Sequence, residues 1–335
     1  MAMHLTQRDH GMNGTAPQAL FDASHGQRNW AQTGFPSREL HTNFAGLTEV
    51  LCRLGFHCCS TADESFNVSL QSSRLLIIPP PTGSYDARRE RWRRQKTSLF
   101  TSEDVRGILG FLRDGGRLLA FAYRFGDSFT QTNLGDLCLA LGCRLNDDAV
   151  IDVRALRKTD PLHLQLDTPA ECLPLGWSRS AVGMVHWRPG ATFTIQPGAT
   201  AWPLALSTGG TCLSFDRTLR RISFASLPLA VVGCHGDGRF ALFGGPHLFE
   251  SSALGLLALA DNTRFLGNLL DWLLRDDARD EPMAKYAPSP LLEPGVPWFS
   301  HVEGCGEGER TIALVERILR KAGVLKALSR AKWMP

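Results

Sequence analysis

The stretch GRFALFGGPHLFES at residues 238–251, with DNTRFLGNLLDWLL shortly after it at 261–274, decides the fold of this chain. Its apolar start predicts a buried strand, and the Gly-Gly turn that ends the strand carries His247 and Glu250. In the second segment, apolar residues recur at three- and four-residue intervals, as they do along one face of an amphipathic helix. We therefore expect a strand, a turn with two ionisable side chains, and a helix over 263–275.

The segments that precede this stretch alternate between strands and helices. GGRLLAFAYRFGDS at 115–128 predicts a helix stop, a buried strand over 117–123, and a turn that holds Tyr123, Arg124 and Phe125. Upstream, the same reasoning predicts a strand at 18–26, a helix at 38–55, a buried strand at 75–78, a helix at 105–116 opened by a capping box at 101–104, and a further strand at either 56–60 or 66–70. This alternation predicts an α/β domain with a doubly wound, mostly parallel sheet.

The organisation changes between residues 152 and 245, where helical periodicity disappears and turn residues multiply. Short alternating stretches predict a β-rich, antiparallel or mixed extension of the sheet, including a hairpin over 228–245. We divide the chain into a flexible N-terminus (1–17), an α/β domain (18–275), a Pro-rich linker (276–307) and a C-terminal amphipathic helix with its tail (308–335).

The composition of the chain does not indicate a particular class of binding partner. Of the 335 residues, 43% are hydrophobic and 21% are charged, which is typical of a globular protein with an ample core. A formal net charge of +3 is too small to imply a nucleic-acid or membrane partner by itself. No apolar run approaches the roughly 20 residues that span a bilayer, and the N-terminus lacks the apolar region of a signal peptide. We therefore expect a cytoplasmic protein without membrane contact.

The nine cysteines lie at residues 52, 58, 59, 138, 143, 172, 212, 234 and 305. None forms a CxxC pair, and no spacing of cysteine and histidine matches a zinc site. Most of them fall in apolar stretches, where a free cysteine behaves as a small hydrophobic residue. The sequence therefore predicts reduced core thiols, without a metal or cofactor.

Four segments carry a resemblance to a known family. They are FDASHGQRNW (21–30), LNDDAVI (145–151), PGATAWPLALSTGGTC (197–212) and the stretch that begins at residue 238. In this order they resemble the GIFT domain and DUF4350-like proteins, found in an intraflagellar transport subunit and in bacterial gliding-motility relatives. The resemblance covers about residues 18–275. It implies a flavodoxin-like fold of the class I glutamine amidotransferase and ThuA-like type, and a non-enzymatic domain that binds a ligand or a partner.

Ligands of open α/β sheets bind beyond the carboxyl ends of the strands. Four turns of this chain should gather at that edge, at 24–27, 79–85, 123–128 and 244–250. We expect them to form one polar pocket. Its candidate ligand-binding residues are Ser24, His25, Gln27, Tyr123, Arg124, Asp127, His247 and Glu250.

Amidase chemistry in such a fold needs a nucleophile on a strained strand-to-helix turn, a histidine to activate it and a carboxylate to orient the histidine. His247 and Glu250 can supply the last two. At the end of the strand at 117–123 the chain offers Tyr123, Arg124 and Phe125 but no cysteine or serine, and the nearest hydroxyl past the strand is that of Ser128. We therefore predict no catalytic residue, as in a pseudoenzyme.

Several alternatives stay open at this point. His247 could have a structural role, hydrogen-bonded to a neighbouring loop. The chain could be a hydrolase that uses His247 and Glu250 with an unusual nucleophile or a metal-bound water. His25, His247, Asp22 and Glu250 are suitable metal ligands by type, but no spacing supports a site, so we predict none.

A basic segment offers a surface for partners. It consists of Arg88, Arg89, Arg91, Trp92, Arg93, Arg94 and Lys96, which we interpret as a charged loop. Such a loop can contact an acidic protein surface, and an aromatic residue within it can also stack on a nucleic-acid base. The leading hypothesis is an accessory subunit of a bacterial multi-protein complex, which binds protein through this loop or the helix after residue 308. A nucleic-acid-associated subunit is the alternative.

Overall fold

The computed structural model describes residues 16–26, 44–61, 66–86, 91–96, 99–152, 164–167, 184–188, 190–207, 212–216, 222–223, 226–250, 256–258 and 261–275. The expected linker at 276–307 and the C-terminal helix at 308–335 lie outside these residues, as do residues 1–15. Among the helices within the described ranges, none combines the length and the apolar character needed to cross a bilayer.

A seven-stranded sheet forms the centre of the molecule, in the order β12-β15-β16-β6-β3-β1-β2. Its strands are β1 (Gln18–Phe21), β2 (His57–Ser60), β3 (Leu75–Ile78), β6 (Arg117–Phe121), β12 (Ala201–Leu206), β15 (Pro228–His235) and β16 (Gly238–Phe243). The five strands from β2 to β16 are parallel, and β15 and β12 extend the sheet in antiparallel fashion. The order of the parallel strands, which reverses between β1 and β3, is the flavodoxin-like order. The predicted mostly parallel α/β sheet is confirmed.

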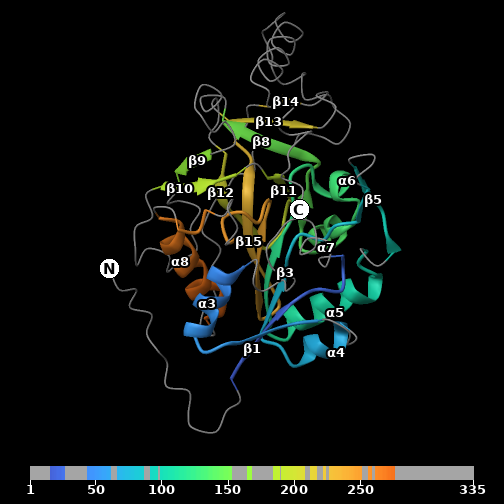
Figure 1. The fold of residues 1–335 in the computed structure, drawn as a ribbon, viewed down its shortest axis with the longest axis vertical. Coiled ribbons are helices and arrows are strands. Elements are labelled where there is room, and N and C mark those ends of the chain that lie inside the picture. Colours follow the sequence, from blue (N-terminus) through green and yellow to red (C-terminus); the bar gives the residue numbers. More distant parts are fainter. Residues whose placement is uncertain are drawn as a thin grey trace, which may run out of the picture.

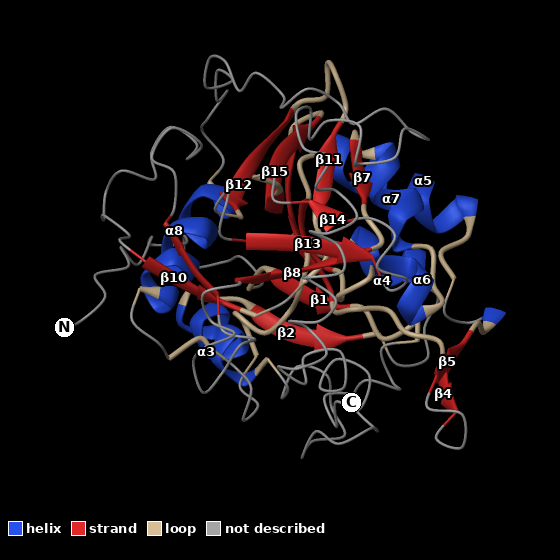
Figure 2. Ribbon diagram, turned by 90° about the horizontal axis from the view of Figure 1, so that it is seen from above, coloured by secondary structure: helices blue, strands red, loops and turns tan. Residues whose placement is uncertain are grey.

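Helices cover both faces of this sheet. Those within the described ranges are α3 (Ala45–Arg53), α4 (Phe66–Gln71), α5 (Ser102–Arg113), α6 (Gly126–Thr130), α7 (Leu134–Ala140) and α8 (Asn262–Leu274). Figures 1 and 2 show α3 and α8 together on one side of the sheet and α4, α5 and α7 on the other. Each face accordingly has its own hydrophobic cluster. The sheet is doubly wound, as the sequence predicts.

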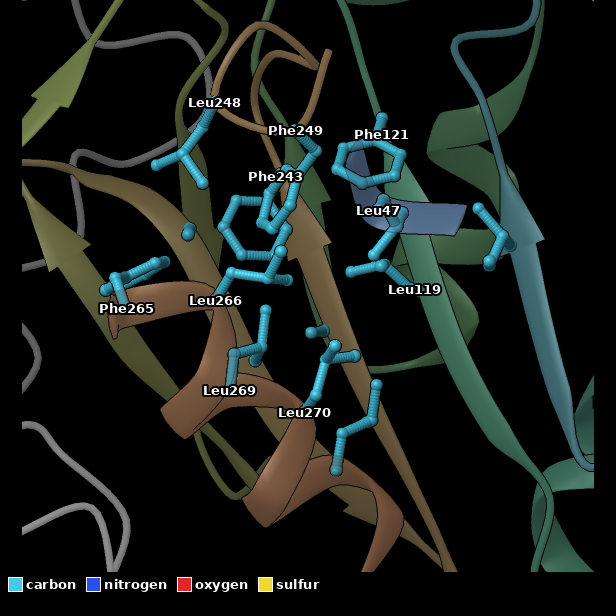
Figure 3. Close-up of a cluster of buried hydrophobic side chains, with 14 of the residues drawn as sticks. Leu47, Leu119, Phe121, Phe243, Leu248, Phe249, Phe265, Leu266, Leu269 and Leu270 are labelled. Atoms are coloured by element: carbon cyan, nitrogen blue, oxygen red, sulfur yellow. The ribbon is translucent and has the colours of Figure 1, made fainter. Parts of the chain in front are cut away.

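The last parallel strand shows how one segment supplies both clusters. Side chains of a strand point alternately to opposite faces. Along β16, Ala241 and Phe243 pack in the cluster under α3 and α8, whereas Phe240 and Leu242 pack in the cluster under α5 and α7. Figure 3 shows Phe243 surrounded by Phe249, Phe121 and the leucines of α8. The continuous apolar run of β16 therefore reflects burial on both faces.

Small antiparallel sheets accompany the main one. They pair β4 (Ser84–Asp86) with β5 (Arg91–Arg93), β7 (Cys143–Leu145) with β11 (Phe193–Ile195), β9 (Leu164–Asp167) with β10 (Met184–Trp187), and β13 (Cys212–Asp216) with both β8 (Asp148–Asp152) and β14 (Ile222–Ser223). Buried Asp148 ties two of these sheets together, because its carboxylate accepts hydrogen bonds from Thr192 and Ser214. The expected β-rich part is thus antiparallel, but most of its described strands form sheets of their own.

The structure decides one alternative and corrects one expectation. Of the two segments that could form the second strand, 56–60 is confirmed as β2, whereas residues 66–70 begin α4, whose Phe66 and Leu70 lie one helical turn apart and are both buried. The basic segment is not a loop throughout, since residues 91–93 form β5 and pair with β4. A run of charged residues therefore does not by itself indicate a loop, because a short hairpin can also expose charged side chains.

Candidate functional site

The carboxyl ends of β1, β3, β6 and β16 lie at one edge of the sheet, because these strands are parallel neighbours. However, β3 and β6 separate β1 from β16. Three strand spacings of about 4.8 Å amount to roughly 14 Å. The residues expected in one pocket therefore form two clusters. One surrounds His247, after β16, and the other surrounds His25, after β1.

The His247 cluster contains a buried histidine–carboxylate pair. Nδ1 of His247 lies 2.6 Å from Oε2 of Glu250, and both side chains are buried. The ring of Tyr123, which follows β6, lies 6.0 Å from the His247 ring, between centroids. The guanidinium carbon of Arg124 lies 5.3 Å from the centroid of the Tyr123 ring and 5.6 Å from that of Phe129. The turns after β6 and β16 thus bring four of the predicted residues together.

Burial favours the neutral form of Tyr123. Burial raises the pKa of Tyr123, and the Glu250 carboxylate raises it further, while the Arg124 guanidinium opposes both. The Tyr123 hydroxyl is therefore protonated at neutral pH. The charges of Arg124 and Glu250 thus both act on this hydroxyl.

The strained position of this turn carries a phenylalanine. Phe125, just before α6, has a φ of 60°, a left-handed conformation that costs a non-glycine residue about 1–3 kcal/mol. Its amide donates a 2.7 Å hydrogen bond to the carbonyl of Asp148, which helps to hold the turn. The hydroxyl of Ser128 donates to the Phe125 carbonyl, 2.9 Å away, and so is engaged within its own turn. In the described part of the chain, no serine or cysteine side chain hydrogen-bonds to His247.

The His25 cluster joins the end of β1 to the start of α5. Nδ1 of His25 lies 2.7 Å from Oδ2 of Asp22, and Nε2 lies 3.4 Å from Oδ2 of Asp104. The imidazole stacks on Phe100 at 3.9 Å between centroids and meets the edge of Phe66 at 5.1 Å. Asp104 also closes the capping box of α5 with Thr101. This histidine therefore links a loop to a helix.

The ionisation of this cluster is coupled. Burial disfavours the imidazolium, but the carboxylates of Asp22 and Asp104 outweigh burial and raise the pKa of His25 above 6.5. Burial also acts to raise the pKa of Asp104, but hydrogen bonds from Thr101 and the nearby His25 lower it below its ordinary value. The folded protein consequently favours a charged His25 beside charged carboxylates.

We expect the stability supplied by His25 to depend on pH. A raised pKa gives a contribution that is complete below the unfolded-state value of about 6.5 and is lost as the pH rises through the folded-state value. The lowered pKa of Asp104 gives a contribution present above about pH 3.9 and lost as the pH falls below it. The difference in free energy of unfolding between wild type and His25→Gln, measured by urea denaturation, should therefore be larger at pH 5.5 than at pH 8.5. A Val68→Ala control, at an exposed position of α4, removes no titratable group and should show no such change, and a His25→Gln difference independent of pH would contradict the assignment.

The remaining predicted residues have other surroundings. Asp127 accepts hydrogen bonds from the hydroxyl of Thr132 and the amides of Leu134 and Gly135, and so caps the start of α7. Burial raises its pKa despite these bonds. The Ser24 hydroxyl lies 3.0 Å from that of Thr61. These contacts give Asp127 and Ser24 structural roles that require no ligand.

Some candidates cannot be placed in either cluster. Gln27, Arg88 and Arg89 lie outside the described residues, and Arg91 and Trp92 lie on β5. Arg93, Arg94 and Lys96 are exposed, so a role in partner or nucleic-acid contact stays a prediction. Among the residues that the structure describes, no three His, Cys, Asp or Glu side chains are grouped so as to hold a metal ion.

Sequence reasoning did not include Asp104, Phe100 or Phe125 in the site. The capping box marks Asp104 as the start of a helix, but its contact with His25 depends on the strand order, which brings α5 beside the end of β1. No local pattern signals the left-handed conformation of Phe125, since phenylalanine is not a residue type enriched there.

No protein-family model matches the chain, and no curated protein matches its sequence. Among the solved structures that match it, two overlay with a TM-score of 0.44 each. One is a protein described as ThuA-like from Bacteroides uniformis, with 12% identity over 81% of this chain and 98% of that one. The other is cytoplasmic protein STM1381 from Salmonella typhimurium, with 14% identity over 77% and 100%.

The mmIFT52 N-terminal domain is more similar. It overlays with a TM-score of 0.58 and 21% sequence identity, over 78% of this chain and 99% of that domain. Identity at this level supports a common fold. The expected GIFT-like resemblance is therefore confirmed for the fold: this chain has an α/β fold similar to that of the IFT52 N-terminal domain.

Proposed function

We propose that this chain is a non-catalytic binding module of a bacterial multi-protein complex, and that it binds a small polar ligand at the His247 cluster. One observation carries the proposal. A buried histidine–carboxylate pair stands beside a strained strand-to-helix turn, and that turn presents the hydrocarbon ring of Phe125 instead of a nucleophile. A pair of this kind without a nucleophile keeps the capacity to orient and hydrogen-bond a ligand.

Two further points support this proposal. Tyr123, Arg124 and Glu250 supply an aromatic face and two opposite charges within a buried setting, which suits recognition of a polar molecule. Six of the cysteines in the described ranges are free thiols, which agrees with a cytoplasmic location. We propose that the protein partner contacts the basic segment or the region after residue 308.

The hydrolase alternative rests on the short contact between His247 and Glu250, which is also the geometry of an oriented general base. A single set of variants distinguishes the two functions. His247→Gln alters the pair, and His235→Gln, at the end of β15, is the matched control.

We expect purified wild-type protein to hydrolyse neither p-nitroanilide amides nor p-nitrophenyl glycosides faster than His247→Gln does. In a thermal-denaturation screen of sugars, amino acids and organic acids, at least one compound should raise the melting temperature of wild type and His235→Gln. Saturation at a hundred times the dissociation constant should give a rise of about 5 °C or more. His247→Gln should lose most of this rise. Turnover that disappears in His247→Gln would favour the hydrolase, and a screen without any binder would refute ligand binding.

A further inference from the structure

Arg124 is buried without a partner for one edge of its guanidinium. Its residue is only 4% exposed, and neither Nε nor Nη2 has a hydrogen-bond partner in the described part of the protein. These two nitrogens direct their N–H groups to the same side of the planar guanidinium. That is the pair of donors that binds two oxygens of a carboxylate or phosphate at once. A buried cation with an unmatched donor pair is costly, so such an arrangement is unusual unless it serves binding.

Glu250 has the complementary deficiency. Its Oε2 contacts His247, but its Oε1 is buried and accepts no hydrogen bond among the described residues. Arg124 and Glu250 do not form an ion pair with each other, although both charges act on the hydroxyl of Tyr123. The site thus combines two unmatched donors with one unmatched acceptor, and both charged groups act on the same tyrosine.

The position of Arg124 is fixed before any ligand arrives. Its guanidinium lies against the rings of Tyr123 and Phe129, and stacking on aromatic rings holds a guanidinium plane in one orientation. Tyr123 and Phe129 in turn stack on each other, with centroids 6.0 Å apart. A donor pair held in place loses little conformational entropy on binding, which favours affinity for an oxyanion.

We propose that the His247 cluster binds a small ligand that carries an oxyanion for the Nε–Nη2 edge of Arg124 and a hydroxyl or amino donor for Oε1 of Glu250. This inference rests on the proposed function and names the chemical class of its ligand. A carboxylate is favoured over a phosphate, because the second negative charge of a phosphate would be repelled by Glu250.

Ligand-observed NMR titrations at constant ionic strength test this chemistry with four probes. Glycolate has both the oxyanion and the donor, acetate lacks the donor, and glycolamide is the neutral counterpart of glycolate. Glycerol 3-phosphate presents the phosphate. We expect glycolate to bind at least about tenfold more tightly than glycolamide and more tightly than glycerol 3-phosphate. A preference for glycerol 3-phosphate over glycolate would leave the oxyanion site standing and assign it to phosphate.

Variants then locate the two contacts. Arg124→Lys keeps the charge but removes the donor pair, and should weaken glycolate at least about tenfold. Glu250→Gln should weaken glycolate more than acetate, since acetate has no donor for that oxygen. Arg144→Lys, on the exposed side of β7, should change the affinity for neither glycolate nor acetate. If Arg124→Lys fails to fold, the comparison of glycolate with glycolamide on wild-type protein decides.

Equal binding of glycolate and glycolamide would overturn the inference, as would unaltered glycolate affinity in a folded Arg124→Lys. So would the absence of saturation by glycolate and glycerol 3-phosphate up to about 50 mM, far above the dissociation constants that such small ligands can reach. If a neutral compound from the thermal-denaturation screen then binds in a way that depends on His247, the proposed function stands although this inference fails. If no compound binds, both the proposed function and this inference are refuted.

Discussion

Replacement of Phe243 by alanine is expected to lower the free energy of unfolding by about 3–5 kcal/mol. Phe243 is completely buried at the end of β16. Its ring lies 4.7 Å from that of Phe249, 5.7 Å from Phe121 and 5.8 Å from Trp187, between centroids. Figure 3 shows the leucines of α8 beneath this group. Removal of the ring leaves a cavity that these surrounding aromatic side chains cannot readily fill.

Urea denaturation of Phe243→Ala measures this loss. Leu139→Ala is the control, because Leu139 is 48% exposed on α7 and its truncation should change stability by no more than about 0.5 kcal/mol. A loss below about 1 kcal/mol for Phe243→Ala would mean that the cluster under α8 is not the main core. Phe249 belongs to the turn that carries His247 and packs on Phe243, so we also expect ligand binding to weaken in this variant.

Replacement of Gly244 by alanine should be nearly as damaging, by about 3 kcal/mol or more. A Cβ at this position would lie 1.8 Å from the carbonyl oxygen of Ala191. The obstacle is backbone, and it is held in place: the Ala191 amide donates to the Gly244 carbonyl, and the Gly244 amide donates to that of Leu229. The added methyl group can be accommodated only if the turn that carries His247 moves.

Gly110→Ala provides the matched control. Gly110 lies within α5, and a Cβ there would meet no atom within 4 Å. Alanine is the better helix former, so this substitution should stabilise the protein by about 0.5–1 kcal/mol. Thermal or urea denaturation of the two glycine variants should therefore shift in opposite directions. Equal shifts would show that the close approach at Gly244 is not what limits the substitution.

Sequence patterns predicted the parts of the fold that depend on local chemistry. Apolar runs located β3, β6 and β16, the capping box located the start of α5, and the Gly-Gly turn located His247 and Glu250. The pair forms because residues three apart in a tight turn can bring their side chains together. These features need little information from the rest of the chain.

The features that sequence analysis missed depend on tertiary structure. The pattern of residues 66–70 is too short to distinguish a strand from a helix, because Phe66 and Leu70 would lie on the same face in either case. The separation of His25 from His247 follows from two strands lying between β1 and β16, an order that the sequence does not encode locally. The contact between His25 and Asp104 depends on the same order.

The central claim is that the histidine–carboxylate pair has no nucleophile to activate. Mass-spectrometric mapping of wild type and His247→Gln, after treatment with iodoacetamide for thiols and a fluorophosphonate for hydroxyls, tests it most directly. We predict the same labelled residues at the same rates in both proteins, because no side chain depends on His247 for its reactivity. A serine or cysteine labelled about a hundredfold faster in wild type, the acceleration that a general base provides, would contradict the account.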